Sequence, residues 1–358
     1  MRQCGRLVIR ASEHRVTLKD VARAAGVSLS AVSYVLNDNG HARRITDQTK
    51  NRIREAARRL GYKCDPIGRA LQRGYTNQVT LLIVTWNLAT SHAATAMAIS
   101  RAAIAEGFEL AVHVADDDKA AEAFLSGHML HRTGGILVLW DSPAMQESSL
   151  TRLATEGVPV VDLLPDSPPG ISTVTVDRED AFLRGTRHLI DLGHQEIALI
   201  CDPIARQKTS LRKTAGYRRA LEESGLRFDE TRIESVSEFG FEGGCEGFRR
   251  LGRRCSAVTG VFCINDAMAL GVIAAAREQG RNCPADLSVL GFGDAAEGRY
   301  FRPRLTTFAL SSSRVAEQAL AVVTSQRKTP TQAPRTILIP EELLVRESTA
   351  AAPVASAH

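Results

Sequence analysis

The sequence of 358 residues lacks the features of a membrane span, a zinc site or a disulfide-stabilised scaffold. No run approaches the roughly 18 uninterrupted apolar residues of a membrane-spanning helix. The seven cysteines are odd in number and form no C-x-x-C pair, which argues against a disulfide framework and a zinc site. The basic first 15 residues contain no apolar run and so are not a secretory signal, which makes the cytoplasm the expected location.

The motifs of common enzyme classes are also missing. The chain contains no G-x-x-x-x-G-K-[ST] phosphate loop, no G-x-S-x-G nucleophile turn and no H-E-x-x-H zinc motif. The glycines of GFGDAAEG, residues 291–298, follow a predicted strand, but their spacing differs from the dinucleotide fingerprint G-x-G-x-x-G. We therefore expect no catalytic residues, no cofactor and no metal ion.

The charge of the chain is unevenly distributed. Apolar residues make up 44 % and charged residues 24 % of the sequence, as in an ordinary globular protein with a sizeable core. Residues 1–76 carry a net charge of +10, whereas the remainder carries −5. A basic head on a mildly acidic body indicates that a polyanion binds the head alone. The alternative at this point is a solvated basic tail.

Residues 15–37, RVTLKDVARAAGVSLSAVSYVLN, have the pattern of two short helices joined by a tight turn. Thr17, with Asp20 three residues later, is a start that resembles a capping box. Gly26 is expected to end the first helix, and Ser28 to cap the second. Such a pair is a helix-turn-helix, whose second helix reads base edges in the major groove of DNA.

A third helix is expected over residues 47–60, with Gly61 ending it. Its apolar residues share one face, and nearly all of its charges are positive. Because these charges flank a groove-reading helix, contact with phosphates is favoured over a merely solvated face. The basic residues are Lys50, Arg52, Arg54, Arg58 and Arg59.

The string TLKDVARAAGVS-x-x-x-VS-x-VLN resembles the head signature of the lactose/galactose repressor family of transcription regulators. The resemblance implies that Leu29, Ser30 and Tyr34 face bases. Ser28, Ser33 and Asn37 would help to hold phosphates, and Thr17 is counted with the DNA-binding residues. Leu29 and Tyr34 are less polar than the residues that many relatives carry there, so the operator sequence stays open.

The next segment, LGYKCDPIGRAL, resembles the hinge of that family. This implies a short helix over about residues 66–71, in which Leu71 enters the minor groove as a wedge. Cys64 stands where relatives often have proline, and Gly68 stands where alanine is usual. Glycine destabilises a helix by about 1 kcal/mol relative to alanine. The hinge helix is therefore expected to form only when the protein is bound to DNA. The alternative is a plain flexible linker.

Beyond residue 77, apolar strands alternate with helices. This alternation predicts an α/β fold of parallel sheets that are covered by helices on both faces. Ligands of such folds bind beyond the carboxyl ends of the strands. Strands are expected at 79–85, 134–140, 158–164, 196–201, 257–264 and 287–292, and helices at 93–106, 180–192, 211–224 and 266–279.

The body continues the resemblance in segments such as HLIDLGHQEIALI, FCINDAMALGVIAAAREQG and DLSVLGFGD. The family fold is similar to periplasmic sugar-binding proteins, with two lobes, several crossing strands and a ligand in the cleft. The match spans roughly residues 16–348. The expected organisation is a basic extension (1–15), a helix-turn-helix domain (16–62), a hinge (63–76), an effector and dimerisation module (77–348) and a disordered tail (349–358).

By position, Asp266 matches the ligand-binding aspartate of the family, because it follows a strand and opens a helix. A helix N-cap is the alternative role for this residue. Phe239 falls where relatives place a ring that stacks on the ligand, although a core position is equally compatible. Relatives usually have an arginine three residues before the glycine of their AGY-like motif, and here Arg212 and Lys213 both remain candidates.

Two further candidates follow strands. Trp86 would stack on a sugar ring, or else serve as a core or dimer contact, and Asp141 is a second cleft carboxylate. The expected effector is a sugar or a sugar derivative, because that is what the family resemblance implies.

The sequence thus predicts a DNA-binding transcription regulator that acts as a repressor. It is expected to bind DNA in the nucleoid as a homodimer. The tail STAAAPVASAH has no leucine heptads of the kind that family tetramers use, so a dimer on a pseudo-palindromic operator is expected. A binding protein with no DNA role and an enzyme are the alternatives. The basic head argues against the first, and the missing motifs argue against the second.

Overall fold

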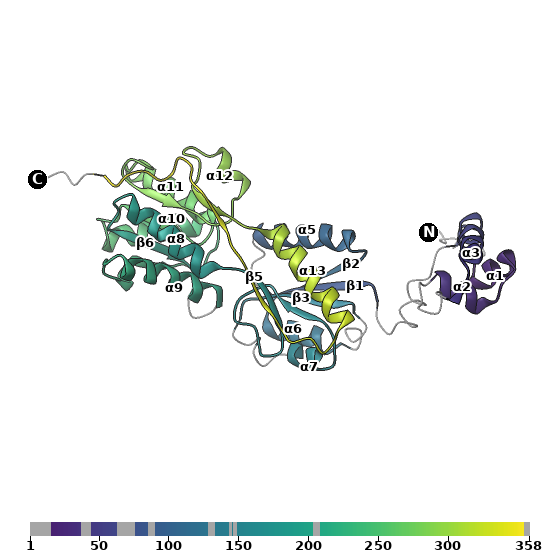
Figure 1. The fold of residues 1–358 in the computed structure, drawn as a ribbon. Coiled ribbons are helices and arrows are strands. Elements are labelled where there is room, and N and C mark those ends of the chain that lie inside the picture. Colours follow the sequence, from purple (N-terminus) through teal and green to yellow (C-terminus); the bar gives the residue numbers. More distant parts are fainter. Residues whose placement is uncertain are drawn as a thin grey trace, which may run out of the picture. The chain divides into compact units, whose positions relative to one another are not determined.

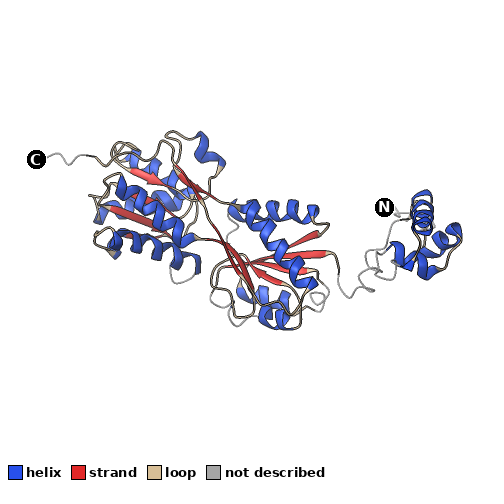
Figure 2. Ribbon diagram, in the orientation of Figure 1, coloured by secondary structure: helices blue, strands red, loops and turns tan. Residues whose placement is uncertain are grey.

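The computed structural model describes residues 16–36, 44–62, 76–84, 90–127, 133–142, 145, 149–202 and 208–353, with the backbone alone at 90–92. The chain separates into two compact units, Met1–Thr76 and Asn77–His358, which we call the head and the body. Figures 1 and 2 show both. Among the described residues, no helix is long and apolar enough to cross a membrane.

The described part of the head consists of α1 (Leu18–Ala25), α2 (Leu29–Leu36) and α3 (Asp47–Arg59). α1 begins after Thr17, whose backbone N–H and hydroxyl donate to the Asp20 carboxylate at 2.9 and 2.7 Å. It ends at Gly26, whose φ of 62° suits a residue without a side chain. Val32 of α2 and Ile53 of α3 are fully buried with the apolar face of α1, so the predicted helix-turn-helix and third helix are both present.

The amino-terminal lobe of the body contains a six-stranded parallel sheet in the order β11-β5-β4-β3-β1-β2. Alternate residues of β1 face opposite ways, so that Leu81 packs beneath α5 and α13 whereas Leu82 packs against α6 and α7. The elements are β1 (Gln78–Val84), α5 (Thr90–Ala105), β2 (Glu109–Ala115), α6 (Asp118–Leu125), β3 (Gly135–Trp140), α7 (Ser149–Thr155), β4 (Val160–Asp162), β5 (Ser172–Val176), α13 (Ser312–Lys328) and β11 (Thr336–Ile339).

The carboxy-terminal lobe contains a four-stranded parallel sheet in the order β7-β6-β8-β9. Its core is centred on the stacked rings of Phe182 and Phe262, whose centroids are 4.1 Å apart. The elements are α8 (Arg178–Asp191), β6 (Ile197–Cys201), α9 (Lys208–Glu223), β7 (Ile233–Ser235), α10 (Phe241–Arg254), β8 (Gly260–Cys263), α11 (Asp266–Glu278), β9 (Ser288–Leu290), α12 (Ala296–Tyr300) and the antiparallel pair β10 (Thr307–Ala309) and β12 (Glu342–Leu344).

Within the described residues, the chain passes between the lobes after β5, after β10 and after β11. Figure 1 shows the yellow segment from β11 running from one lobe to the other beside β5. As a consequence, β11 completes the amino-terminal sheet and α13 covers it, although both follow the four-stranded sheet of the carboxy-terminal lobe in sequence. The predicted α/β fold with a helical head is confirmed.

The end of the chain departs from expectation. Residues 349–353, expected to begin a disordered tail, are placed against the carboxy-terminal lobe. The Ala350 N–H donates to Ser288 Oγ at 3.0 Å, and the Ala352 N–H donates to the Leu192 carbonyl at 2.8 Å. These hydrogen bonds use only backbone groups of the tail, which explains why its small side chains gave no sign of them.

Candidate nucleic-acid interface and effector site

α2 presents a face that is free to contact DNA. Leu29 is 43 % exposed, Ser30 is exposed, and Ser33 and Tyr34 are half-buried. An exposed leucine beside Val32, which is fully buried, has no packing role within the head. In a major groove it would contact the methyl group of thymine.

Hydroxyl groups lie at the amino-terminal ends of the first two helices. Ser28 Oγ accepts a hydrogen bond from the Ala31 N–H at 3.2 Å, as expected of an N-cap. Thr17 is exposed, with its hydroxyl held by Asp20. Helix amino-termini favour anions, so this edge suits the phosphate backbone. Asn37, Leu71 and the hinge around it lie outside the described residues.

The basic side chains of α3 form a second potential contact with phosphates. Lys50 donates to Asp47 at 2.8 Å, within the first turn. The other basic side chains of this helix are exposed, on the side away from its buried residues, and are Arg52, Arg54, Arg58 and Arg59. The head therefore combines an exposed reading helix with surrounding cations.

In the body, a carboxylate lies at or just beyond the carboxyl end of most strands. Asp141 follows β3, Asp162 ends β4, Asp202 follows β6 and Asp266 comes shortly after β8. Because both sheets are parallel, these ends gather where the two lobes meet. The arrangement is that of a polar ligand site between the lobes.

Asp266 is almost fully buried, at 2 % exposure. Its carboxylate accepts hydrogen bonds from the Ala295 N–H and the Thr307 hydroxyl, each at 2.5 Å. Burial raises its pKa to about 6, against the lowering effect of those two hydrogen bonds. The alternative N-cap role is wrong, because Asn265 caps α11 by accepting from the Met268 N–H at 2.8 Å.

The structure separates the two candidates on α9. Lys213 is buried, with its Nζ 6.0 Å from the centre of the Phe292 ring, and burial lowers its pKa while Asp202 opposes that shift. Arg212 instead points outward. It forms an ion pair with Asp166 and donates to Glu179 at 3.1 Å. Lys213 is therefore the residue of the two that lies among the strand ends.

Asp141 joins the lobes directly. It accepts hydrogen bonds from the backbone N–H of Thr209, at 3.1 Å, and from the Thr209 hydroxyl. Lys208, the residue before Thr209, forms a buried ion pair of 3.4 Å with Asp162. Burial raises the pKa of Asp162 to about 6, although Lys208 lowers it. Sequence reasoning missed Lys208, Asp162 and Asp202. The position of Asp202 directly after the predicted strand 196–201 was a usable signal, whereas Asp162 lies inside the predicted strand 158–164.

Phe239 is connected to Asn265, the residue before Asp266. Its ring is partly buried against the core of the carboxy-terminal lobe, and its carbonyl accepts a hydrogen bond from Asn265 Nδ2 at 3.0 Å. Trp86 lies outside the described residues. No group of His, Cys, Asp or Glu side chains within the described part of the chain is arranged to hold a metal ion.

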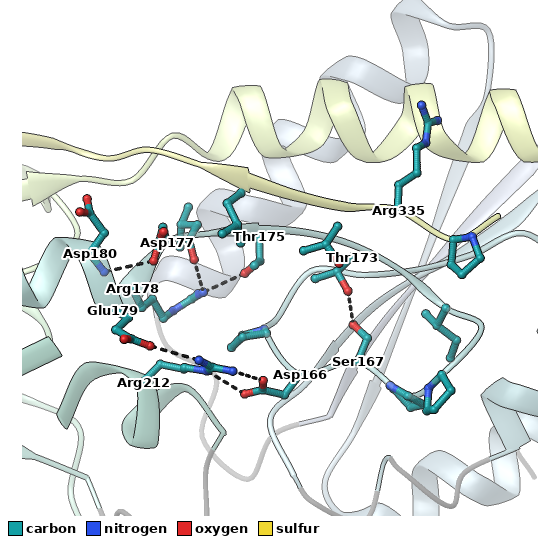
Figure 3. Close-up of a pocket in the computed structure, with 18 of the residues that line it drawn as sticks. Asp166, Ser167, Thr173, Thr175, Asp177, Arg178, Glu179, Asp180, Arg212 and Arg335 are labelled. Carbon is teal, nitrogen blue, oxygen red and sulfur yellow. Dashed lines mark hydrogen bonds and ion pairs between the residues drawn. The ribbon is translucent and has the colours of Figure 1, made fainter. Parts of the chain in front are cut away.

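A cavity of about 690 Å³ lies elsewhere, beside β5, β11 and the start of α8. Figure 3 shows Arg212 between Asp166 and Glu179 at this place. Of the expected effector residues only Arg212 lines the cavity. We assign the effector site to the strand ends instead, because the charges of this cavity neutralise one another whereas the strand ends hold buried polar atoms without partners.

Comparison with known proteins agrees with both halves of the chain. Residues 17–65 match the model for bacterial regulatory proteins of the lacI family, and residues 186–349 match that of a periplasmic binding protein-like domain. Catabolite control protein A of Priestia megaterium is 30 % identical over 336 residues, covering 93 % of this chain and 99 % of that protein.

The chain belongs to the lacI family.

Other lacI-family proteins match over similar lengths. The HTH-type transcriptional repressor PurR of Haemophilus influenzae is 30 % identical over 93 % of this chain and 98 % of its own length. A lac repressor dimer bound to operator and an anti-inducer has the same fold, with a TM-score of 0.77 at 23 % identity over 94 % of this chain and 99 % of that one. This lacI-family protein is a DNA-binding transcription regulator with a body that takes a small-molecule effector.

Proposed function

We propose that the protein is a repressor that binds a pseudo-palindromic operator as a homodimer and responds to a sugar or a sugar derivative. The observation that carries the proposal is the exposed face of α2, with Leu29 at 43 % exposure on a head of net charge +10. Relatives that match over almost the whole chain are named repressors.

Within this proposal, Leu29, Ser30 and Tyr34 read bases. The residues that hold the phosphate backbone are Thr17, Ser28, Ser33 and Asn37. Leu71, in the hinge, spreads a base step in the minor groove. The lac repressor structure is an operator complex, which supports the same use of this head.

The effector site is proposed at the strand ends, with Asp266 as the central acceptor. Phe239 and Trp86 supply rings, and Asp141 and Lys213 complete the site. A related structure is a complex with cellobiose, which supports a sugar-like ligand. We place Arg212 outside this site, because its guanidinium is held by Asp166 and Glu179.

Exposed apolar side chains on two neighbouring elements of the amino-terminal lobe support a homodimer. They are Met97 and Ile104 on α5, at 57 % and 72 % exposure, and Val112 and Val114 on β2, at 50 % and 45 %. Such a patch is costly in water and typical of a protein–protein interface. A two-fold dimer places two heads on two half-sites.

The proposed boundaries are an extension (1–15), the helix-turn-helix domain (16–62), the hinge (63–76) and the effector and dimerisation module from 77 onward. We propose that the protein acts on the nucleoid in the cytoplasm and catalyses no reaction. The family of transcription regulators supports both statements.

Selection of binding sites from a pool of random DNA duplexes with the full chain tests the proposal. We expect an enriched inverted repeat. Leu29→Ala should weaken binding to that repeat about tenfold, since a lost base contact costs on the order of 1 to 3 kcal/mol. Leu211→Ala, which removes an equally exposed leucine from the body, is the matched control and should bind normally. A pool that shows no enrichment, or equal losses in both variants, would contradict the function.

A further inference from the structure

The carboxyl group of one buried acid in the body makes no hydrogen bond to the described residues. Glu341 is 3 % exposed, and neither oxygen of its carboxyl group has a hydrogen-bond partner among the described residues. It lies between β11 and β12, where the chain passes from one lobe to the other. Its backbone is fixed, because its carbonyl accepts a hydrogen bond from Arg184 at 2.7 Å.

Burying a carboxyl group without partners is expensive. A buried polar group that makes no hydrogen bond costs about 1 to 3 kcal/mol, and a charged group costs more. Proteins rarely retain such groups outside functional sites. Burial raises the pKa of Glu341 to about 8, although Arg178, Arg184 and Lys213 lower it, so the group is largely protonated at neutral pH.

Two other buried side chains, Lys213 and Asp202, have hydrogen-bonding capacity that is not used among the described residues. Asp202, at 1 % exposure, has one oxygen bonded to the Ser210 hydroxyl and the other oxygen free. Lys213 makes no hydrogen bond among the described residues, and it links the other two groups, because Asp202 raises the pKa of Lys213 and Lys213 lowers the pKa of Glu341. The free oxygen of Asp202, the Lys213 ammonium group and the carboxyl group of Glu341 thus lie in one region, where the carboxy-terminal lobe meets the connection to the other lobe.

We propose that Glu341 contacts the effector and that its carboxyl group, together with Asp202 and Lys213, binds hydroxyl groups of a polyhydroxylated ligand. A protonated carboxyl group both donates and accepts a hydrogen bond, as does a hydroxyl group, so the two are matched. This inference rests on the proposed function, because it names a specificity-determining residue of the same site.

Binding to a defined panel tests the inference. The probes are D-glucose, D-galactose, D-ribose and cellobiose, with adenine and guanine as non-hydroxylated comparators. Thermal shift identifies the compounds that stabilise the full-length wild type, because a ligand of the folded state raises its melting temperature. Calorimetry then gives Kd for the wild type and for the variants.

We expect at least one sugar to bind the wild type. Glu341→Leu, which fills the space without polar atoms, should weaken that sugar at least tenfold. Glu341→Gln keeps a donor and an acceptor, so its Kd should stay within about threefold of the wild-type value. Glu342→Leu changes the exposed neighbour and is the matched control, with unchanged Kd. Asp266→Ala, in the proposed site itself, should abolish binding.

Three results would overturn the inference: wild-type affinity in Glu341→Leu, binding of the nucleobases alone, or binding of no compound. If Asp266→Ala loses the ligand while Glu341→Leu keeps it, the effector site stands and only the role of Glu341 fails. Failure of the regulator function itself would appear separately, as absence of sequence-specific DNA binding.

Discussion

Carboxyl groups in the body differ mainly in how burial is compensated. Asp162 has an ammonium group at 3.4 Å, and Asp266 has two hydrogen-bond donors at 2.5 Å. Glu341 has neither, and its pKa is raised furthest of the three, to about 8. The order follows from physical chemistry, because a carboxylate that leaves water without hydrogen-bond donors is compensated only by more distant cations, here Arg178, Arg184 and Lys213.

The raised pKa of Glu341 predicts a specific dependence of stability on pH. An acid with a higher pKa in the folded state binds more protons there, so its contribution to stability falls as pH rises. For Glu341 the window runs from about pH 4.5 to about pH 8. Glu341→Gln removes this titration. The free energy of unfolding of the variant, relative to that of the wild type, should therefore increase by on the order of a few kcal/mol from pH 5 to pH 9.

Urea unfolding of wild type and Glu341→Gln at pH 5, 7 and 9 measures this gain. The other charged or titratable groups that face Glu341 are Arg178, Arg184, Asp177 and Lys213, and burial lowers the pKa of Lys213. Glu342→Gln on the surface controls for the loss of one negative charge. A midpoint difference that is the same at all three pH values would show that Glu341 does not titrate in this window.

At the residue scale, sequence reasoning selected Asp266 and Asp141 because each follows a strand, and Lys213 because of its place before the AGY-like motif. It could not separate Lys213 from Arg212, since neighbours on a helix point in directions that depend on what the helix packs against. Glu341 was invisible, because its sequence neighbours Pro340 and Glu342 are exposed. Only the tertiary structure shows that the segment passes between two lobes.

At the scale of elements, the strands that were predicted are apolar runs, and the polar strand β5 was not among them. β5, STVTV, was missed although Ser172, Thr173 and Thr175 are all buried. Its hydroxyls are satisfied inside the protein. Ser172 Oγ accepts hydrogen bonds from Gln326 Nε2 and the Arg335 N–H, at 3.0 and 3.2 Å. A buried strand whose polar atoms are paired does not produce the apolar run that marks it in a sequence.

Glycine explains another missed element, α10. Its sequence FEGGCEGFRRLGRR is rich in a residue that disfavours helices. The glycines are needed for close packing, because a Cβ atom on Gly244 would lie 2.0 Å from the Met268 carbonyl oxygen of α11. The same is true where α8 meets α9, since a Cβ on Gly216 would lie 2.2 Å from the Glu179 carbonyl oxygen.

Gly216→Ala should therefore destabilise the body, even though alanine is the better helix former. Overpacking costs about 1 to 3 kcal/mol, and the clash is with backbone that cannot rotate away. Gly252→Ala is the matched control, because its Cβ would meet only Gln279 Oε1 at 3.6 Å. That variant should be neutral or more stable by up to about 1 kcal/mol.

Thermal unfolding of both variants decides the matter. A fall in melting temperature for Gly216→Ala with no fall for Gly252→Ala confirms that α8 and α9 need the glycine for their close approach. Equal melting temperatures in the two variants would mean that α9 shifts at little cost.

At the scale of the whole molecule, opposite charges are divided between the two units. The head carries +10 and the rest of the chain −5. The positive charge favours any duplex over none, whereas the face of α2 distinguishes one sequence from another. Composition alone predicted this division, because net charge depends only on which residues are present.

The charge of the head predicts a steep salt dependence. Each phosphate neutralised by a basic side chain releases condensed counterions, which weakens binding as salt rises. Affinity for a duplex of unrelated sequence should fall by a factor on the order of 10³ between about 50 and 200 mM salt, as for a protein with several phosphate contacts. Fluorescence anisotropy at four salt concentrations measures the slope, and a flat response would contradict phosphate binding by the head.

The passages between the lobes also set the order in which the body can fold. The amino-terminal sheet receives its last strand, Thr336–Ile339, and its covering helix, Ser312–Lys328, only after the parallel sheet of the carboxy-terminal lobe has been synthesised. On the ribosome, the first lobe to emerge is thus left incomplete while the second sheet is made, with the edge of β5 and one apolar face uncovered for more than 130 residues of synthesis. Exposed strand edges invite wrong pairing. A gene that is cut between the lobes would encode an amino-terminal lobe that permanently lacks this strand and this helix. Neither lobe can therefore be transferred to another protein as one continuous segment.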